Sequence, residues 1–333
     1  DTLDCLQSLK RLRYPRLTTV VVDNGSAPAE ADGIEASGLA RAVLRQRENL
    51  GFAGGCNVGI RYALERGAAY VWLLNNDTVV DPLCLDALVA AGERDARIGL
   101  LSPVLYDYDA PDVIQFAGTV LDLPGQRSPT LTSLDDPRAR GQEGRLGLWG
   151  TALLIKRRVV EAVGPLDERY FAYVEDMDYC VRALQAGFAT RLVREASVYH
   201  KHGFALAGPD AHLREYLITR NDYLFWTTHL RGWPRWSYRM RYIPWVLRRW
   251  IDARLRDQPQ VEACIASGGW DALRGHWGAW ERRGRAPAAL RAVARGVLGW
   301  RPYFWAMLLA GNFRGLVSET VGRLFSSRPS RCW

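Results

Sequence analysis

The stretch Tyr70-Val71-Trp72-Leu73-Leu74-Asn75-Asn76-Asp77 decides the fold of this chain. Its first five residues form a continuous apolar run, which is typical of a buried strand covered on both faces. Three polar residues follow at once. In open α/β sheets, ligands bind just beyond the carboxyl ends of such strands. A carboxylate there can hold a divalent metal, which in turn can hold phosphates, so we expect a metal and phosphate site at Asp77.

Strand and helix patterns alternate on both sides of this stretch. Strands are expected at 17–22, 42–44, 69–74, 98–102, 113–121, 150–155 and 196–199. Helices are expected at 1–12, 27–40, 54–66, 82–91, 158–163 and 176–185. This alternation predicts an α/β fold with a mostly parallel sheet flanked by helices. Residues 122–147 are rich in Pro, Gly, Asp and Arg, which predicts a long mobile loop.

Four short motifs follow one another in a recognisable order. They are Val21-Val22-Asp23-Asn24-Gly25-Ser26, Asn49-Leu50-Gly51-Phe52-Ala53-Gly54-Gly55-Cys56-Asn57-Val58-Gly59, Leu74-Asn75-Asn76-Asp77 and Glu175-Asp176-Met177-Asp178. Together they resemble the family 2 glycosyltransferases, in particular their rhamnosyltransferase-like branch, over about residues 1–205. The resemblance implies a GT-A-type domain and inverting transfer of a sugar, with rhamnose favoured, from a dTDP- or UDP-linked donor. The acceptor it implies is a glycan or a lipid-linked glycan in cell-surface polysaccharide synthesis.

The same resemblance implies that the chain is N-terminally truncated. In the family, a first strand and a short turn precede the helix that begins here near Asp1. Part of the nucleotide pocket would then be missing from this chain.

The resemblance assigns the donor site to Asp23, Asn49, Gly51 and Asn76. Asp23 would accept a hydrogen bond from the imide N–H of uracil or thymine; the alternative is a carboxylate that caps a turn. Glycines before a helix let a backbone approach a ligand closely. A plain helix N-terminus remains the alternative reading of that segment.

The metal site is assigned to Asp77 and His200, with Mg²⁺ or Mn²⁺ as the ion. Many relatives carry Asp where this chain has Asn75, so one carboxylate and one imidazole would hold the metal. His202 is the competing imidazole, and a surface histidine or an Asp at a helix start is the structural alternative.

Asp176 is the expected catalytic base, because a nearby carboxylate can take the proton of an attacking hydroxyl. Burial and the neighbouring Glu175 and Asp178 should raise its pKa; the alternative is a solvated acidic helix start. Arg182 lies within helical reach of Asp178 and is expected to be its structural partner. The sugar or acceptor pocket is expected to include Trp149, Gly150, Thr151 and Glu175.

The last third of the chain differs in composition from the rest. Residues 211–333 hold 21 Arg against 8 Asp or Glu and 11 of the 13 Trp, whereas residues 1–210 hold 23 Lys or Arg against 28 Asp or Glu. We therefore expect a catalytic domain at 1–210 and a basic helical region at 211–333. Arg231 to Arg256 interleaves Arg with Trp and Tyr, which suits an interfacial helix on anionic lipid. The alternative is a helical subdomain packed on the core with its Arg residues in solvent.

Other features narrow the setting of the protein. The apolar run 297–309 is too short to span a membrane, and no signal peptide is visible. The 6 Cys show no metal-ligand spacing, which favours free thiols in a reducing compartment. A cytoplasmic protein at the inner face of the membrane is expected. Nucleic acid is not an expected partner, because the front domain is acidic and carries no nucleic-acid motif.

Two other classes of function remain open at this point. A nucleotidyltransferase also uses a metal and a glycine-rich loop, but 49–59 lacks the Lys or Arg that would hold a triphosphate. A non-catalytic nucleotide-sugar-binding or membrane scaffold is the second alternative.

Overall fold

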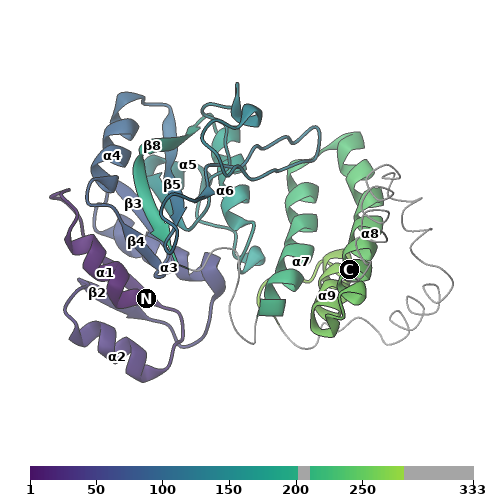
Figure 1. Cartoon of the computed structure of the whole chain (residues 1–333), viewed down its shortest axis with the longest axis horizontal. Helices are drawn as coiled ribbons and strands as arrows, with labels where there is room; N and C mark the ends of the chain where they lie inside the picture. Colours follow the sequence, from purple (N-terminus) through teal and green to yellow (C-terminus); the bar gives the residue numbers. More distant parts are fainter. Residues whose placement is uncertain (202–210, 281–333) are drawn as a thin grey trace, which may run out of the picture.

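The computed structural model describes residues 1–201 and 211–280, which form a mixed α/β body joined to a layer of helices (Figure 1). The strands are β1 Val20–Asp23, β2 Ala42–Arg45, β3 Tyr70–Leu74, β4 Thr78–Val80, β5 Ile98–Asp107, β6 Ile114–Phe116, β7 Ala152–Lys156 and β8 Ala189–His200. The α-helices are α1 Thr2–Lys10, α2 Pro28–Ala36, α3 Gly51–Glu65, α4 Cys84–Arg94, α5 Arg157–Val163, α6 Glu175–Gln185, α7 Ala211–His229, α8 Gly232–Leu255 and α9 Pro259–Arg274. His202 and the apolar run 297–309 lie outside the described residues.

The central sheet is mixed, which corrects the expectation of a mostly parallel one. Its strand order is β3-β7-β5-β8-β4, with β6 paired to β5, and β1 and β2 form a separate parallel pair. Only β5 and β8 run parallel within the central sheet; the pairs β3–β7, β5–β7, β4–β8 and β5–β6 are antiparallel. Parallel neighbours need a crossover connection. Strand β7 instead follows the irregular segment 122–147, so it enters the sheet in the opposite direction.

Both faces of the central sheet are covered, as the apolar run in β3 predicts. Leu100 of β5 joins a core with α3, α5 and α6, whereas Leu101 and Leu105 join a core with α4 on the other face. Successive residues of a strand point to opposite faces, so a strand buried on both sides must be apolar throughout. Helix α3 packs against both β1 and β3 and so lies beside the first pair of strands and the central sheet.

Several elements extend beyond their predicted limits. Helix α3 begins at Gly51 rather than at 54, and β8 begins at Ala189 rather than at 196. Segment 122–147 is irregular, as predicted, apart from the short 3-10 helix Pro137–Ala139. Leu131 within it is fully buried and anchors the segment on the body of the protein.

Helices α7, α8 and α9 form the separate layer in Figure 1, and α6 faces it. Met177 and Val181 of α6 share a buried cluster with Leu224 and Trp226 of α7 and Tyr242 of α8. The described part of the basic region therefore packs directly on the helix that carries the acidic cluster.

Candidate functional site

Asp77 and His200 come together at one end of the central sheet. Asp77 follows β3 and precedes β4, and His200 is the last residue of β8, which pairs with β4. His200 Nε2 lies 3.2 Å from Asp77 Oδ2, and the two side chains are 7% and 19% exposed. Residues 123 positions apart along the chain thus form one buried pair, as the metal-site hypothesis requires.

Gln115 of β6 determines which ring nitrogen of His200 carries the proton. Its Nε2 donates to Asp107 Oδ2 at 2.9 Å and to the carbonyl oxygen of His200 at 3.1 Å. Its Oε1 therefore faces His200 Nδ1, 3.0 Å away, and must accept the proton that Nδ1 carries. Hydrogen bonds from Gln115 and from the backbone of Ala110 lower the pKa of Asp107, which keeps it an acceptor. The ring nitrogen that remains for a cation is Nε2.

The Asp77–His200 pair fits a divalent metal. With the ring proton on Nδ1, the Nε2 lone pair and a carboxylate oxygen face each other, and such a contact needs a cation between them, either a second ring proton or a metal. Two ligands at right angles on a metal with bonds of about 2.1 Å are themselves about 3 Å apart, close to the observed separation. Within residues 1–201 and 211–280 there is no group of three or more His, Cys, Asp or Glu side chains placed to hold a metal. These two protein ligands would leave the other positions to substrate oxygens or water.

Asp176 lies in the first turn of α6 and is tied to the start of β7. Its Oδ2 accepts a hydrogen bond from the backbone N–H of Gly150 at 2.9 Å, and its Oδ1 accepts one from Met177 N–H at 2.7 Å. Burial raises the pKa of Asp176, although these two donors oppose the shift. The expected rise is therefore present, with burial as its first cause.

Glu175, next to Asp176 in the chain, also has a raised pKa. It is 4% exposed, and Oε2 has no hydrogen-bond partner among the described residues. Burial first, and then the charge of Asp176, raise the pKa of Glu175 well above its usual value. The negative charge of Asp176 therefore disfavours ionisation of Glu175 beside it.

Backbone contacts connect Asp176 with the metal pair. Thr151 O accepts from Asn75 N–H at 2.9 Å, so the residues next to Gly150 lie against the end of β3, two positions before Asp77. The ring of Trp149 stacks on Phe116, with centroids 4.1 Å apart, and Phe116 follows Gln115. The predicted residues Trp149, Gly150, Thr151, Glu175 and Asp176 thus share one sheet edge with Asp77 and His200.

The predicted donor residues form a second, neighbouring group around Asn24. Its Nδ2 donates to Asn49 Oδ1 at 3.1 Å and to Gly51 O at 2.8 Å, and its Oδ1 accepts from Leu50 N–H at 2.9 Å. Asp23 accepts from Ser26 N–H at 3.0 Å, which is the turn-capping contact of the structural alternative. Gly51 has φ +73°, and a Cβ there would lie 2.4 Å from Phe171 O, so only glycine fits.

Asn76 directly precedes Asp77, but its side chain contacts the first helix. Its side chain is exposed and donates from Nδ2 to Thr2 Oγ1 of α1 at 2.9 Å. This contact ties the end of β3 to the first helix of the chain, so its expected role with the donor stays a prediction.

The acidic cluster divides into two roles by contact. Asp178 accepts from Arg182 Nε at 2.7 Å, which confirms the predicted structural pair, and from His229 of α7 at 2.7 Å. Burial opposes the ionisation of Asp178, but the hydrogen bond with His229 and the charge of Arg182 together hold its pKa below the usual value. Asp178 therefore joins α6 to α7, whereas Asp176 is bonded to the backbone just before β7.

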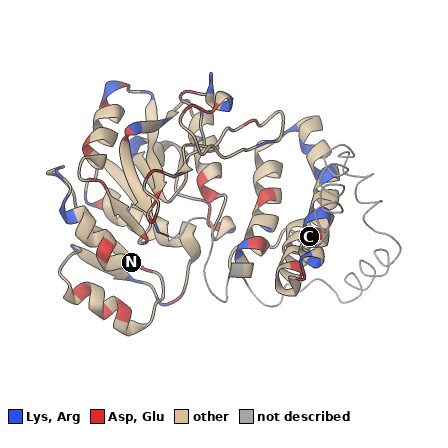
Figure 2. Ribbon diagram, viewed as in Figure 1, with Lys and Arg blue, Asp and Glu red and all other residues tan. Residues whose placement is uncertain are grey.

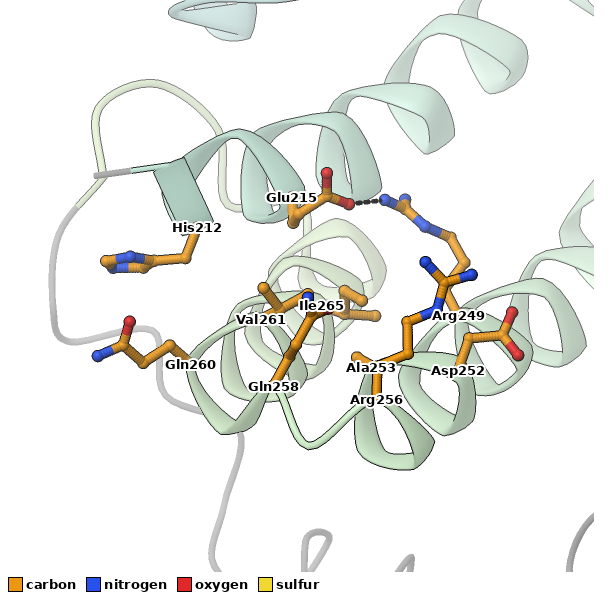
Figure 3. Close-up of a pocket in the computed structure, with 10 residues that line it drawn as sticks. All are labelled: His212, Glu215, Arg249, Asp252, Ala253, Arg256, Gln258, Gln260, Val261 and Ile265. Atoms are coloured by element: carbon orange, nitrogen blue, oxygen red, sulfur yellow. Dashed lines mark hydrogen bonds and ion pairs between the residues drawn. The ribbon is translucent and has the colours of Figure 1, made fainter. Parts of the chain in front are cut away.

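Four further residues contact the predicted site residues and were not predicted from the sequence: Asn24, Gln115, Asp107 and His229. Asn24 lies within a quoted motif, whereas Gln115 lies inside a predicted strand with nothing to distinguish it. The predicted set also leaves out a pocket of about 510 Å³ between α7, α8 and α9 (Figure 3). Its Arg249 is ion-paired with Glu215, so opposite charges offset each other there.

The sequence of this chain is similar to those of known glycosyltransferases. The family model described as "Glycosyl transferase family 2" matches residues 2–163. The N-acetylglucosaminyl-diphospho-decaprenol L-rhamnosyltransferase of Mycobacterium tuberculosis (strain CDC 1551 / Oshkosh) is 30% identical over 267 residues, which cover 73% of this chain and 83% of that protein. The galactofuranosyltransferase GlfT1 of Mycolicibacterium smegmatis is 27% identical over 187 residues, or 55% of this chain and 61% of that protein.

Solved structures show the same fold. The crystal structure of S. aureus TarS residues 1–349 in complex with UDP-GlcNAc matches with a TM-score of 0.50 and 14% identity, covering 82% of this chain and 77% of that one. A second TarS structure has the same TM-score and identity and covers 94% of this chain and 53% of that one. The mixed α/β body with its flanking helices is therefore of the GT-A type.

Proposed function

Since this chain belongs to glycosyltransferase family 2, we propose that it transfers a sugar from a nucleoside-diphosphate sugar to an acceptor hydroxyl. The observation that carries the proposal is the gathering of the Asp77–His200 pair and the half-buried Asp176 at one sheet edge. In open α/β sheets, ligands bind at such an edge. Rhamnose from a dTDP donor and a lipid-linked glycan acceptor are the proposed substrates, supported by the name of the relative at 30% identity. Cell-wall polysaccharide synthesis is the proposed setting.

The proposed reaction is an inverting displacement with Asp176 as the base. The acceptor oxygen attacks the anomeric carbon from the face opposite the diphosphate, its bond to carbon forms as the carbon–diphosphate bond breaks, and its proton passes to the Asp176 carboxylate. Burial suits this role, because a carboxylate with a raised pKa is a stronger base near neutral pH. No covalent sugar–enzyme intermediate is required, unlike in retaining glycosidases.

Asp77 and His200 are the proposed ligands of Mg²⁺ or Mn²⁺. A bound metal would neutralise charge on the departing diphosphate. The chain's own contribution is to hold the two ligands 3.2 Å apart and to direct His200 Nε2 toward Asp77 through Gln115. The Asn24, Asn49 and Gly51 turn, with Asp23 beside it, is the proposed donor-binding segment.

The exposed face of α8 is the proposed contact with an anionic membrane surface. Trp233, Trp236, Met240 and Ile243 are 71%, 52%, 58% and 50% exposed and recur every three or four residues, so they share one face. The rings of Trp233 and Trp236 stack with centroids 4.8 Å apart. Exposed Arg residues lie along the same helix, visible as blue segments in Figure 2. Within the described residues, no helix is both long and apolar enough to cross a membrane.

The test is transfer assayed with the purified protein, Mn²⁺, dTDP- and UDP-sugars and a polyprenyl-diphosphate-linked acceptor. Asp176→Asn keeps the shape of the side chain but removes the base, so kcat should fall by about 10²–10⁴-fold. The matched control is Asp167→Asn, which changes an Asp of the preceding segment that pairs with Arg169; its kcat should stay near that of the wild type.

Three results would contradict the proposal. Full activity of Asp176→Asn would show that Asp176 is not the base. Donor binding without transfer to any acceptor would favour a non-catalytic binding protein. Release of diphosphate from a nucleoside triphosphate and a sugar phosphate would favour a nucleotidyltransferase.

A further inference from the structure

The segment just before the acidic pair has an unusual backbone. Phe171, Tyr173 and Val174 have φ values of +65°, +69° and +76° although none of them is glycine. Positive φ is uncommon in non-glycine residues and is an outlier for a β-branched residue such as Val174. Each such residue costs about 1–3 kcal/mol and persists only where its surroundings hold it. Glu175 and Asp176 follow directly, so their position depends on whatever holds this segment.

Asn221 of α7 holds the segment by its side chain. Its Nδ2 donates to the carbonyl oxygens of Tyr170 at 2.9 Å, Ala172 at 2.8 Å and Tyr173 at 2.8 Å. Asn221 is 0% exposed. The two N–H bonds of this amide are thus shared among three carbonyl oxygens of the strained turn, and removing the side chain would take these hydrogen bonds away.

Arg220, also 0% exposed, fixes the orientation of that amide. Its Nε donates to Asn221 Oδ1 at 3.0 Å, which leaves Asn221 Nδ2 pointing to the segment. Its Nη2 donates to Tyr170 O at 2.9 Å, and its Nη1 donates to Gly278 O at 2.6 Å. Burial lowers the pKa of Arg220, because a charged group is unfavourable away from water. The hydrogen bonds to backbone carbonyls offset that cost.

The opposite side of the segment contacts the proposed donor turn. Phe171 O accepts from Ala53 N–H in the first turn of α3 at 3.0 Å, and Phe171 also packs where a Cβ at Gly51 would stand. The segment 170–174 therefore lies between Arg220–Asn221 on one side and the Asn49–Gly51 turn on the other. A shift of this segment would move the base relative to the donor.

We infer that Arg220 and Asn221 are positioning residues of the reaction, which act by holding segment 170–174 so that Asp176 meets the acceptor hydroxyl. The inference rests on the proposed transferase function. It makes the helical region part of the catalytic apparatus, because α7 sets the geometry of a base carried by α6. Neither residue touches the reacting atoms; their effect passes through the backbone of the segment.

The test compares Asn221→Ala with a matched change on the same helix. Thr227→Val removes one hydrogen bond of a buried side chain on the same helix, from Thr227 Oγ1 to the carbonyl oxygen of Tyr223 at 2.6 Å, six residues beyond Asn221. Asn221→Ala should lower kcat by about 100-fold, the cost of misplacing a catalytic group by about 1 Å, with the donor KM little changed. The acid limb of its pH–rate profile should move to lower pH, because Asp176 would regain water and lose part of its raised pKa.

Thr227→Val should lose some stability but keep the wild-type kcat and pH profile. A wild-type kcat and profile in Asn221→Ala would overturn the inference, as would an equal loss of kcat in Thr227→Val. If Asn221→Ala does not fold, hydrogen exchange of the wild-type protein decides: the amides of Phe171 and Ala172, which donate to Glu168 O and Tyr170 O, should be protected as strongly as those of the middle of α7, and fast exchange there would overturn the inference. Absence of transfer by the wild type would count against the proposed function, while the exchange result would still report on the segment.

Discussion

At the scale of single residues, proton placement decides what the site can bind. His200 has two ring nitrogens, and Gln115 occupies one of them because Asp107 and a backbone carbonyl fix the direction of the Gln115 amide. Such outer contacts orient metal-ligating imidazoles and raise their basicity. Asp107 and Gln115 therefore matter to the proposed metal site although neither would contact the ion.

Replacing Gln115 by Leu should weaken Mn²⁺ binding by about 10–100-fold, the usual cost of losing an outer-shell partner. The physical reason is that the His200 ring would no longer be held as the Nδ1–H tautomer. Mn²⁺ binding is measured directly, by the loss of the free-ion EPR signal on titration. Gln185→Leu, at an exposed position in α6, is the control and should bind Mn²⁺ as the wild type does; equal affinity in Gln115→Leu would contradict the tautomer argument.

The pH dependence of the wild-type reaction is also set at this scale. Burial raises the pKa of Asp176 and, more strongly, that of Glu175. Because the base must be ionised, kcat/KM should fall as pH drops through a value above the ordinary carboxyl pKa of about 4. A pH–rate profile of the free enzyme measures this limb. A limb at the ordinary carboxyl value would show that Asp176 is solvated in solution.

At the scale of elements, α6 is held from both sides. Its first turn contacts the residues just before β7 through Gly150, and Asp178 ties it to α7 through a hydrogen bond with His229, while Arg182 of α6 pairs with the same carboxylate. The side chains of Asp178 and His229 are 2% and 3% exposed. Breaking a buried pair from one side leaves an uncompensated charge, so this contact should contribute strongly to stability.

Asp178→Asn should lower the free energy of unfolding by about 3–5 kcal/mol at neutral pH. Since the folded-state pKa of Asp178 is lowered, its contribution is present above the usual carboxyl pKa and is lost as pH falls through the lowered value. Urea unfolding of wild type and variant at several pH values measures both effects, and the difference should shrink at low pH. Asp95→Asn is the control: Arg97 lowers the pKa of Asp95 to about 2 at an exposed position, where little stability is at stake. Equal effects of the two changes would contradict the argument.

At the scale of the whole molecule, the helical layer has two faces with different chemistry. Its inner face packs on α6 and holds segment 170–174. The exposed face of α8 presents the stripe Trp233, Trp236, Met240 and Ile243 beside Arg residues. Under the proposed function, one layer would thus connect a lipid surface to the position of the proposed base, which would suit a lipid-linked acceptor.

The double change Trp233→Ser and Trp236→Ser should abolish most flotation with vesicles of anionic phospholipid at low salt, because amphipathic rings and nearby cations drive interfacial binding. Binding of the wild type should weaken as salt rises. Leu83→Ser with Leu273→Ser removes two other apolar side chains, both 49% exposed, and should leave flotation unchanged. Absence of wild-type flotation, or equal loss in the control, would rule out this face as the membrane contact.

Apolar periodicity and charge are local properties of the chain, so they were enough to predict the covered sheet, the acidic and imidazole groups and the basic aromatic region. The Asp178–Arg182 pair could also be predicted, since residues four apart are neighbours on a helix. The mixed strand directions, the contact of Gln115 with His200 and the contacts of Asn221 with segment 170–174 could be seen only in the folded protein. These depend on residues that are far apart along the chain and on which atoms of a side chain face a neighbour, and neither leaves a periodic signal in the sequence.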